Sequence, residues 1–181
     1  MRHRLFGWPD GRRTLLRGGG LLLVVFLAAA CGYHRPGRQD PSRPVPTVHL
    51  LAFSNDTFRP GLQGAVVAAI QRQLHLDARI PLVEAGRADL ILAGRVSGYG
   101  VEALAFDQSD IGRRFRVRVV ATLSARSRTE ERVRFQEEFW GEAYYTAADT
   151  VQAVRASEEE AVRRAVQDLA TRVAARLLEE W

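Results

Sequence analysis

The sequence has one cysteine and no lysine, so all 26 of its basic residues are arginine. A single thiol cannot close a disulfide within the chain and cannot build a cysteine-based metal site. The main apolar run, Leu21–Ala30, has ten residues, whereas a helix needs about 20 apolar residues to cross a bilayer. The chain also lacks HExxH and GxSxG patterns and a glycine-rich phosphate loop. We therefore expect no metal site and no cofactor, and we predict a protein that is not an enzyme.

The first 33 residues have the pattern of an export signal. Five arginines precede the apolar run, and the small residues Ala28–Ala30 lead directly to Cys31. A lone cysteine at this place resembles the bacterial lipoprotein signal, in which the sulfur carries a diacylglycerol. We predict a signal peptide at residues 1–30 and lipidation of Cys31, with a buried cysteine or a weak membrane anchor as the alternatives. The pair Arg12–Arg13 is compatible with a twin-arginine export route as well as with a plain basic leader.

Removal of the leader changes the charge balance. Residues 1–30 contain five arginines and one aspartate, so residues 31–181 keep 21 basic and 20 acidic side chains, a net charge of about +1. The net charge of +5 of the whole chain is therefore no argument for a nucleic-acid partner.

Residues 31–46 contain four of the seven prolines and few aliphatic side chains. Such a segment cannot pack a core, so we expect an extended tether between the lipidated cysteine and the domain. Residues 47–181 are long enough to form one domain with its own core.

The spacing of apolar residues predicts the first elements of this domain. Pro60 suits the first turn of a helix, because its missing N–H is not needed there. Gly94, Gly98 and Gly100 predict a bulge or a close approach of the backbone. The expected elements are a strand at Val48–Phe53 closed by a turn at Ser54–Asp56, a helix from Pro60 to His75, a short strand at Ile80–Val83 and a longer strand at Ala88–Tyr99.

The clearest pattern is a hairpin in the second half of the chain. From Arg114 to Arg126, apolar residues alternate with polar ones, which predicts a strand with one buried face. A second strand follows a polar turn at Ser127–Glu130. Pairing their apolar faces joins even positions to even positions and sets Arg116 and Arg118 across from the group Glu138, Trp140 and Glu142. Opposed charges there contribute about 0.2–1 kcal/mol per pair.

A helix of about 24 residues is expected at the end of the chain. Ser157–Glu160 forms a capping box, and Val162, Val166 and later apolar residues form one stripe. The element order is thus β-α-β-β-β-α. We predict an α+β fold in which two helices pack on one face of a four- to five-stranded, mostly antiparallel or mixed sheet.

Four motifs follow one another along the chain: Cys31–His34, Leu50–Thr57, Pro60–Leu62 and Ala88–Val96. In this order they resemble the LPS-assembly lipoprotein LptE family. The resemblance implies an outer-membrane lipoprotein, anchored by its lipid and lying at the periplasmic side or inside a barrel lumen. It also implies that the chain partners the β-barrel LptD as a plug and assembly factor and binds lipopolysaccharide. Gly32 after the cysteine, rather than Asp, agrees with transfer to the outer membrane.

Candidate contacts for lipopolysaccharide follow from its chemistry. The lipid presents phosphates beside fatty chains, so a binder needs arginine forks beside apolar or aromatic surface. Arg113 and Arg114 follow the loop Phe106–Gly112, and Arg155 follows Tyr144 and Tyr145. The alternatives are that Arg114 only pairs with Glu142 and that Arg155 is a solvated loop residue.

Two other functions remain open at this point. A regulator of a peptidoglycan synthase is the first, because a long tether would let an outer-membrane lipoprotein reach into the periplasm. A small hydrolase is the second. After cleavage, however, His34, His49 and His75 fall on the tether, a strand and a helix end. The neighbouring carboxylates Glu137 and Glu138 point to opposite faces of a strand, so neither pattern indicates a catalytic pair.

Overall fold

The computed structural model describes residues 45–77, 79–106, 108, 112–147 and 150–179. The predicted signal peptide, the lipidation of Cys31 and the tether up to residue 44 lie outside the described residues.

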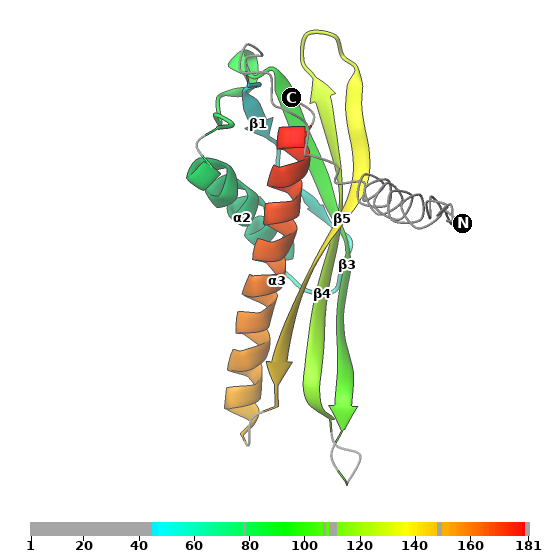
Figure 1. The fold of residues 1–181 in the computed structure, drawn as a ribbon. Helices are drawn as coiled ribbons and strands as arrows, with labels where there is room; N and C mark the ends of the chain where they lie inside the picture. The colour runs from blue at the N-terminus through cyan, green and yellow to red at the C-terminus, as the bar shows by residue number, and fades with distance from the viewer. Residues whose placement is uncertain (1–44, 78, 107, 109–111, 148–149, 180–181) are drawn as a thin grey trace, which may run out of the picture. The chain divides into compact units, whose positions relative to one another are not determined.

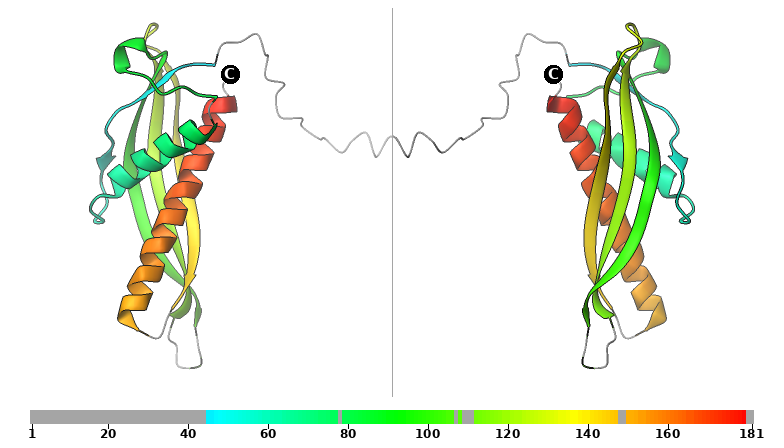
Figure 2. Two further views of the ribbon diagram at one scale, coloured as in Figure 1. Left: turned by 90° about the vertical axis from the view of Figure 1, so that its left-hand side faces the viewer. Right: turned by 90° about the vertical axis from the view of Figure 1, so that its right-hand side faces the viewer.

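The domain is a mixed five-stranded sheet with two helices on one face (Figures 1 and 2). The strand order is β1-β3-β4-β5, and β2 also pairs with β3. Strands β1 and β2 run parallel to β3, whereas β3, β4 and β5 are antiparallel. This confirms the predicted α+β fold and its element order. The elements are β1 (Val48–Leu50), β2 (Ser54–Asn55), α2 (Leu62–Asp77), the 3-10 turn η1 (Ala85–Arg87), β3 (Leu90–Phe106), β4 (Gly112–Ser127), β5 (Val133–Thr146) and α3 (Val151–Glu179).

The predicted hairpin is β4 and β5, and the predicted pairing of even with even positions is confirmed along most of it. The predicted partners of the arginines are confirmed only in part, because Glu138 lies opposite Thr122 and not opposite an arginine. Even positions face even positions, with Arg118 opposite Glu142 and Val120 opposite Trp140, although Arg116 lies opposite Tyr144. The odd positions of β4 face the helices, because burying that apolar face drives the two layers together. The fully buried side chains of β4 are Val117, Val119, Ala121, Leu123 and Ala125.

Helix α2 also follows the prediction closely. The chain enters it through Gly61, whose φ of +78° is a conformation that favours glycine. The five apolar residues that define the predicted stripe are all buried: Leu62, Val66, Ala69, Ile70 and Leu74.

The first strand is shorter than predicted. Strand β1 ends at Leu50, and Ser54–Asn55, predicted as a turn, pairs with β3 as β2. Between β1 and β2 the chain leaves the sheet, because the Phe53 side chain turns into the core. Its ring lies so close to the backbone of β3 that only a glycine, Gly94, fits beside it. A β-carbon on Gly94 would lie 2.4 Å from the Phe53 ring, which confirms the predicted close approach.

Two other boundaries of the sheet differ from the prediction. Instead of a strand at Ile80–Val83 there is a single bridge between Leu82 and Val48. Strand β3 continues to Phe106 rather than ending at Tyr99, because its second half pairs with β4 along the whole distance to Gly112. The predicted bulge is confirmed, since the register shifts between Val96 and Gly98.

The start of helix α3 is a correction. The helix begins at Val151, and Thr150 caps it by accepting a hydrogen bond from Ala153 N to its Oγ1 at 3.2 Å. Ser157 therefore lies inside the helix, and the expected capping box is wrong. With 29 residues, α3 spans about 43 Å and runs along the sheet (Figure 1).

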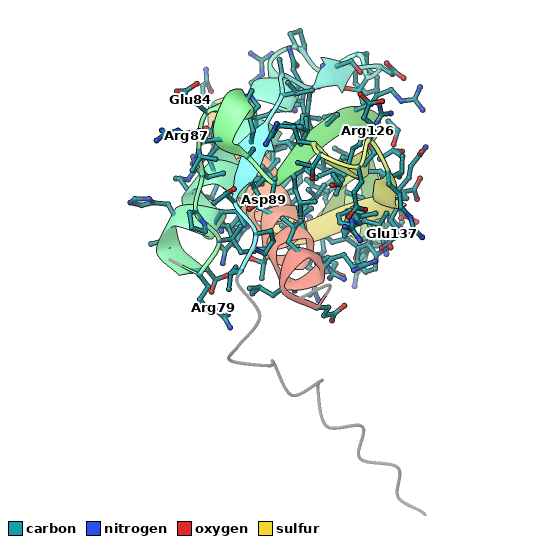
Figure 3. The ribbon with its side chains drawn as sticks, turned by 90° about the horizontal axis from the view of Figure 1, so that it is seen from above. Arg79, Glu84, Arg87, Asp89, Arg126 and Glu137 are labelled. Atoms are coloured by element: carbon teal, nitrogen blue, oxygen red, sulfur yellow. The ribbon has the colours of Figure 1, made fainter. Side chains whose placement is uncertain are left out.

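The described chain enters the domain beside Asp89, which ties this entry to the start of β3. Asp89 Oδ2 accepts hydrogen bonds from Thr47 N at 2.9 Å and from Thr47 Oγ1 at 2.8 Å. Figure 3 looks onto this end, with Asp89 near the middle and Glu84 and Arg87 to one side. These hydrogen bonds to the charged form lower the pKa of Asp89 below its usual 3.8.

Replacing Asp89 by alanine should lower stability in a pH-dependent way. A carboxyl group with a lowered pKa stabilises the fold above its unfolded value and loses this effect as pH falls through the folded value. We expect Asp89→Ala to lower the free energy of unfolding by about 1 kcal/mol at neutral pH. The difference in unfolding free energy between the variant and wild type should shrink below pH 3.8. Urea unfolding at a series of pH values from 7 to 2 measures this difference in unfolding free energy, with Glu84→Ala as the control. A difference that stays constant down to pH 2 would contradict the assignment.

Candidate functional site

A row of three arginines lies on the face of the sheet that carries no helix. Arg114, Arg116 and Arg118 are the even positions of β4, between the apolar residues that face the helices. Because side chains alternate along a strand, all three project to this open face. The open face is therefore cationic along the middle strand.

Two carboxylates partly neutralise this row. Arg116 Nη2 lies 2.5 Å from Glu102 Oε2 on β3, and this bond raises the pKa of Arg116. Glu142 on β5 is shared, with its Oε1 at 3.4 Å from Arg118 Nη1 and at 3.8 Å from Arg116 Nη1. Glu142 thus pairs with Arg116 and Arg118, and not with Arg114 as in the alternative weighed from the sequence.

Aromatic rings of β5 lie beside the same arginines. Arg114 Cζ is 5.4 Å from the centre of the Tyr144 ring, and Arg118 Cζ is 4.9 Å from the Trp140 ring. Arg172 of α3 also stacks on Trp140, at 3.9 Å. At such distances the cation is attracted by the ring face. The open face therefore alternates guanidinium groups with aromatic surface, which suits a ligand with both anionic and apolar parts.

The distal end of the domain adds exposed apolar side chains to these cations. We use this name for the end of the sheet where β3 finishes and where β4 and α3 begin, at the bottom of Figure 1. Phe106 is 59% exposed and Val151 is 66% exposed. Large exposed apolar groups clustered at one end mark an interaction surface. The exposed apolar residues of the distal end are Leu104, Phe106, Tyr144 and Val151.

The structure brings the three predicted arginines to this distal end but divides them between two layers. Arg113 and Arg114 are exposed at the start of β4, and Arg114 faces the open side of the sheet. Arg155 is exposed near the start of α3, in the helix layer, and within the described part of the chain it forms no salt bridge. Arg155 is thus a helical residue and not the loop residue considered from the sequence.

A hydrogen-bonded network of three residues was not predicted from the sequence. Arg59 Nη1 donates hydrogen bonds to Tyr99 Oη at 2.7 Å and to Glu158 Oε1 at 2.9 Å, and Tyr99 Oη donates to Glu158 Oε1 at 2.8 Å. Burial and the bond to Glu158 raise the pKa of Tyr99 to about 12, so its phenol remains a donor at neutral pH. The network ties the turn before α2 to β3 and α3.

No signal along the chain reveals this network, because its members are far apart in sequence. Phe58, the neighbour of Arg59, packs edge-to-face on Tyr99 with ring centres 5.6 Å apart and stays 82% exposed. An exposed phenylalanine held on a fixed support is a second apolar contact point on the surface.

The described residues offer little for metal or catalytic chemistry. Within them, no three His, Cys, Asp or Glu side chains come together as a metal site would require. A hollow of about 340 Å³ contains His49, Glu84 and Arg87. His49 Nδ1, however, lies 3.0 Å from the carbonyl oxygen of Val83, so this ring helps to hold the segment beside β1. The helices of the described part also include none with the length and apolar character of a membrane span.

Comparison with known proteins connects this arrangement to one family. The model of the LptE family, described as lipopolysaccharide-assembly, matches residues 45–177. No curated protein matches the sequence.

Several solved structures share the fold at low identity. Protein XCC0632 from Xanthomonas campestris is 12% identical with a TM-score of 0.59, over 78% of this chain and 89% of that one. The hypothetical protein CT253 from Chlamydia trachomatis is 13% identical with a TM-score of 0.52, over 73% and 95%. A minor lipoprotein from Acinetobacter baumannii is 13% identical with a TM-score of 0.50, over 74% and 93%. At these identities the likeness describes the fold alone.

Proposed function

Because the chain belongs to the LptE family of lipopolysaccharide-assembly proteins, we propose that it is an outer-membrane lipoprotein that partners an LptD-type β-barrel. In this proposal Cys31 carries the lipid anchor and residues 31–46 are the tether. The domain of residues 47–181 plugs the barrel, supports its assembly and binds lipopolysaccharide during its insertion into the outer leaflet.

The distal end of the domain is the observation that carries the proposal. Lipid A presents phosphates at the base of fatty chains, so it requires cations directly beside apolar surface. Arg114 lies against Tyr144, and Phe106 is exposed at the same end. Guanidinium groups match phosphates with two parallel hydrogen bonds. We propose Arg113, Arg114 and Arg155 as the residues that contact the phosphates.

The proposed role is binding and assembly, without catalysis. The family match supports it. In the hollow that His49 lines together with Glu84 and Arg87, the His49 ring lies in a structural contact with the carbonyl oxygen of Val83.

Purification of the tagged full-length protein from its native outer membrane tests the partnership. Mass spectrometry of the purified complex should identify a large β-barrel protein in near-stoichiometric amount. Recovery of a peptidoglycan synthase without a barrel would favour the alternative function as a regulator of cell-wall synthesis, and recovery of neither would contradict the proposed partnership.

Removing two of the candidate arginines should weaken lipopolysaccharide binding. Hydrogen bonds to charged groups contribute about 1.5–3 kcal/mol, so we expect Arg114→Ala and Arg155→Ala each to raise the Kd for lipopolysaccharide roughly 10-fold or more. Binding of the purified protein to lipopolysaccharide, measured with and without its phosphates, provides the readout.

Arg126→Ala is the matched control, because Arg126 is an exposed arginine at the opposite end of β4. It should bind lipopolysaccharide as wild type does. Equal losses in all three variants would mean that only the overall charge matters and that the distal end is not the site.

A further inference from the structure

The outer edge of β3 is only half covered. Strand β1 pairs with residues 90–92 of β3 and β2 pairs with residues 95 and 96. The last bond on this side runs from Asp56 N to Val96 O at 3.0 Å. Beyond it, the described residues provide no strand beside residues 98–106, although β4 pairs with them on the other side. We call residues 98–106 the open edge of β3.

The opposite edge of the sheet, formed by β5, is covered by a helix. Helix α3 lies along β5, and its Asp168 Oδ2 accepts the hydrogen bond of Glu142 N at 3.1 Å. Arg164 Nη2 donates to Tyr144 O at 2.7 Å. Side chains of α3 thus satisfy backbone groups that would otherwise attract another strand. Uncovered edges do attract strands, and proteins usually block them with charges, prolines or bulges.

The open edge carries this protection only at its two ends, where the register with β4 shifts between Val96 and Gly98 and again between Ala103 and Phe106. The open edge is regular from Gly98 to Ala103. It contains no proline, and Glu102, its single charge, is engaged by Arg116 at 2.5 Å. On the helix side it is bordered by Val101, 41% exposed, and by Phe58. A strand added here would therefore bury apolar side chains on its helix-facing positions.

The other face of the same edge favours a different side chain. Gly98 and Gly100 have none of their own. Beside the ion pair of Glu102 with Arg116, this face carries the exposed guanidinium groups of Arg95 and Arg118. Arg95 forms an ion pair with the exposed Asp56, at 3.2 Å. An added strand would therefore match both faces of this edge if its apolar side chains alternate with polar or acidic ones.

We propose that the open edge of β3 receives an extended segment of the β-barrel partner by strand addition. This rests on the proposed function. Strands of outer-membrane barrels alternate apolar and polar residues, which is the pattern that this edge accepts. A barrel that has not yet closed has free edges of its own, and backbone pairing supplies affinity without a specific sequence. The open edge would thus hold such a strand while the barrel forms.

Two other occupants fit less well. The chain's own tether has prolines at positions 36, 41, 44 and 46, which cannot donate to a ladder. It also joins the domain at Val45, beside Leu90 and thus at the other end of β3. A second copy paired antiparallel at Glu102 would place the two domain entries about 80 Å apart along the strand direction. Such a pair would also set the Glu102 side chains of the two copies directly opposite each other, and like charges in that position are destabilising.

Site-specific crosslinking of the full-length protein in its native membrane tests the proposal. With the photoreactive residue p-benzoylphenylalanine in place of Val101, ultraviolet light should produce an adduct with the barrel protein, identified by mass spectrometry. The control position is Leu76 on α2, which is 76% exposed and lies away from the edge. It should give no adduct with the barrel.

A charge at the edge provides the second measurement. Val101→Lys should reduce the barrel recovered with the tagged protein roughly fivefold, whereas Leu76→Lys should not, and both variants should melt as wild type does. If wild type recovers the barrel but residue 101 crosslinks elsewhere or to a second copy, the edge proposal is wrong and the proposed function stands. If wild type recovers no barrel, both fail.

Discussion

Gly141→Ala should cost about 3 kcal/mol of unfolding free energy, although it adds only one methyl group. A β-carbon at Gly141 would lie 2.0 Å from Ala165 O and 2.5 Å from Leu169 N. Both atoms belong to the backbone of α3, so they cannot move aside as the end of a flexible side chain would. The helix must instead shift away from β5, which loosens the layer that buries the core. We expect the Tm to fall on the order of 10 °C.

Gly100→Ala is the matched control for this prediction. It makes the same substitution in the neighbouring sheet region, but a β-carbon at Gly100 meets no atom within 4 Å. Its unfolding free energy should stay within about 0.5 kcal/mol of wild type. Thermal melting of both variants in detergent provides the comparison. Equal melting curves would mean that α3 does not press on β5 at Gly141.

The elements that were predicted well are those with a pattern inside one short segment. The alternation in β4 identified Val117 and Leu123 as buried, and the three- and four-residue spacing in α2 identified its buried stripe. Such patterns are present in the sequence because one face of each element contacts the core and the other face does not. They are therefore visible before any tertiary contact is known.

Boundaries set by distant contacts were predicted poorly. Glu158 belongs to an apparent capping box, yet it lies inside α3 and binds Arg59, 99 positions away. Strand β2 has two residues and exists only because β3 supplies the other side of the ladder. A local pattern cannot reveal a partner that lies so far along the chain.

The candidate site was predicted in part for the same reason. Arg114 and Arg155 were singled out from their neighbours in sequence, and both are exposed at the distal end. The contribution of Arg172 was missed, because only the packing of α3 against β5 brings it onto Trp140. The open edge of β3 was missed as well, since a strand's free side depends on where other strands end.

Val117→Asp should abolish folding at neutral pH. Val117 is fully buried between Val101 of β3 and Ala143 of β5 in the register of the sheet. A carboxylate there has no cation to pair with, and burying an unpaired charge costs several kcal/mol. We expect a loss above about 4 kcal/mol, which is most of the 5–15 kcal/mol that stabilises a typical domain.

Val120→Asp, three positions away on the open face opposite Trp140, should cost only about 1 kcal/mol, because its carboxylate remains in contact with water. The two variants therefore test which face of β4 is buried.

Burial raises the pKa of an introduced carboxyl group, so the folded state binds a proton more readily than the unfolded state does. Stability of Val117→Asp should consequently recover as pH falls, whereas that of Val120→Asp should show no such recovery. Circular dichroism melting curves at pH 7 and pH 4 measure both effects. A stable Val117→Asp beside an unfolded Val120→Asp would mean that the apolar face of β4 points away from α3.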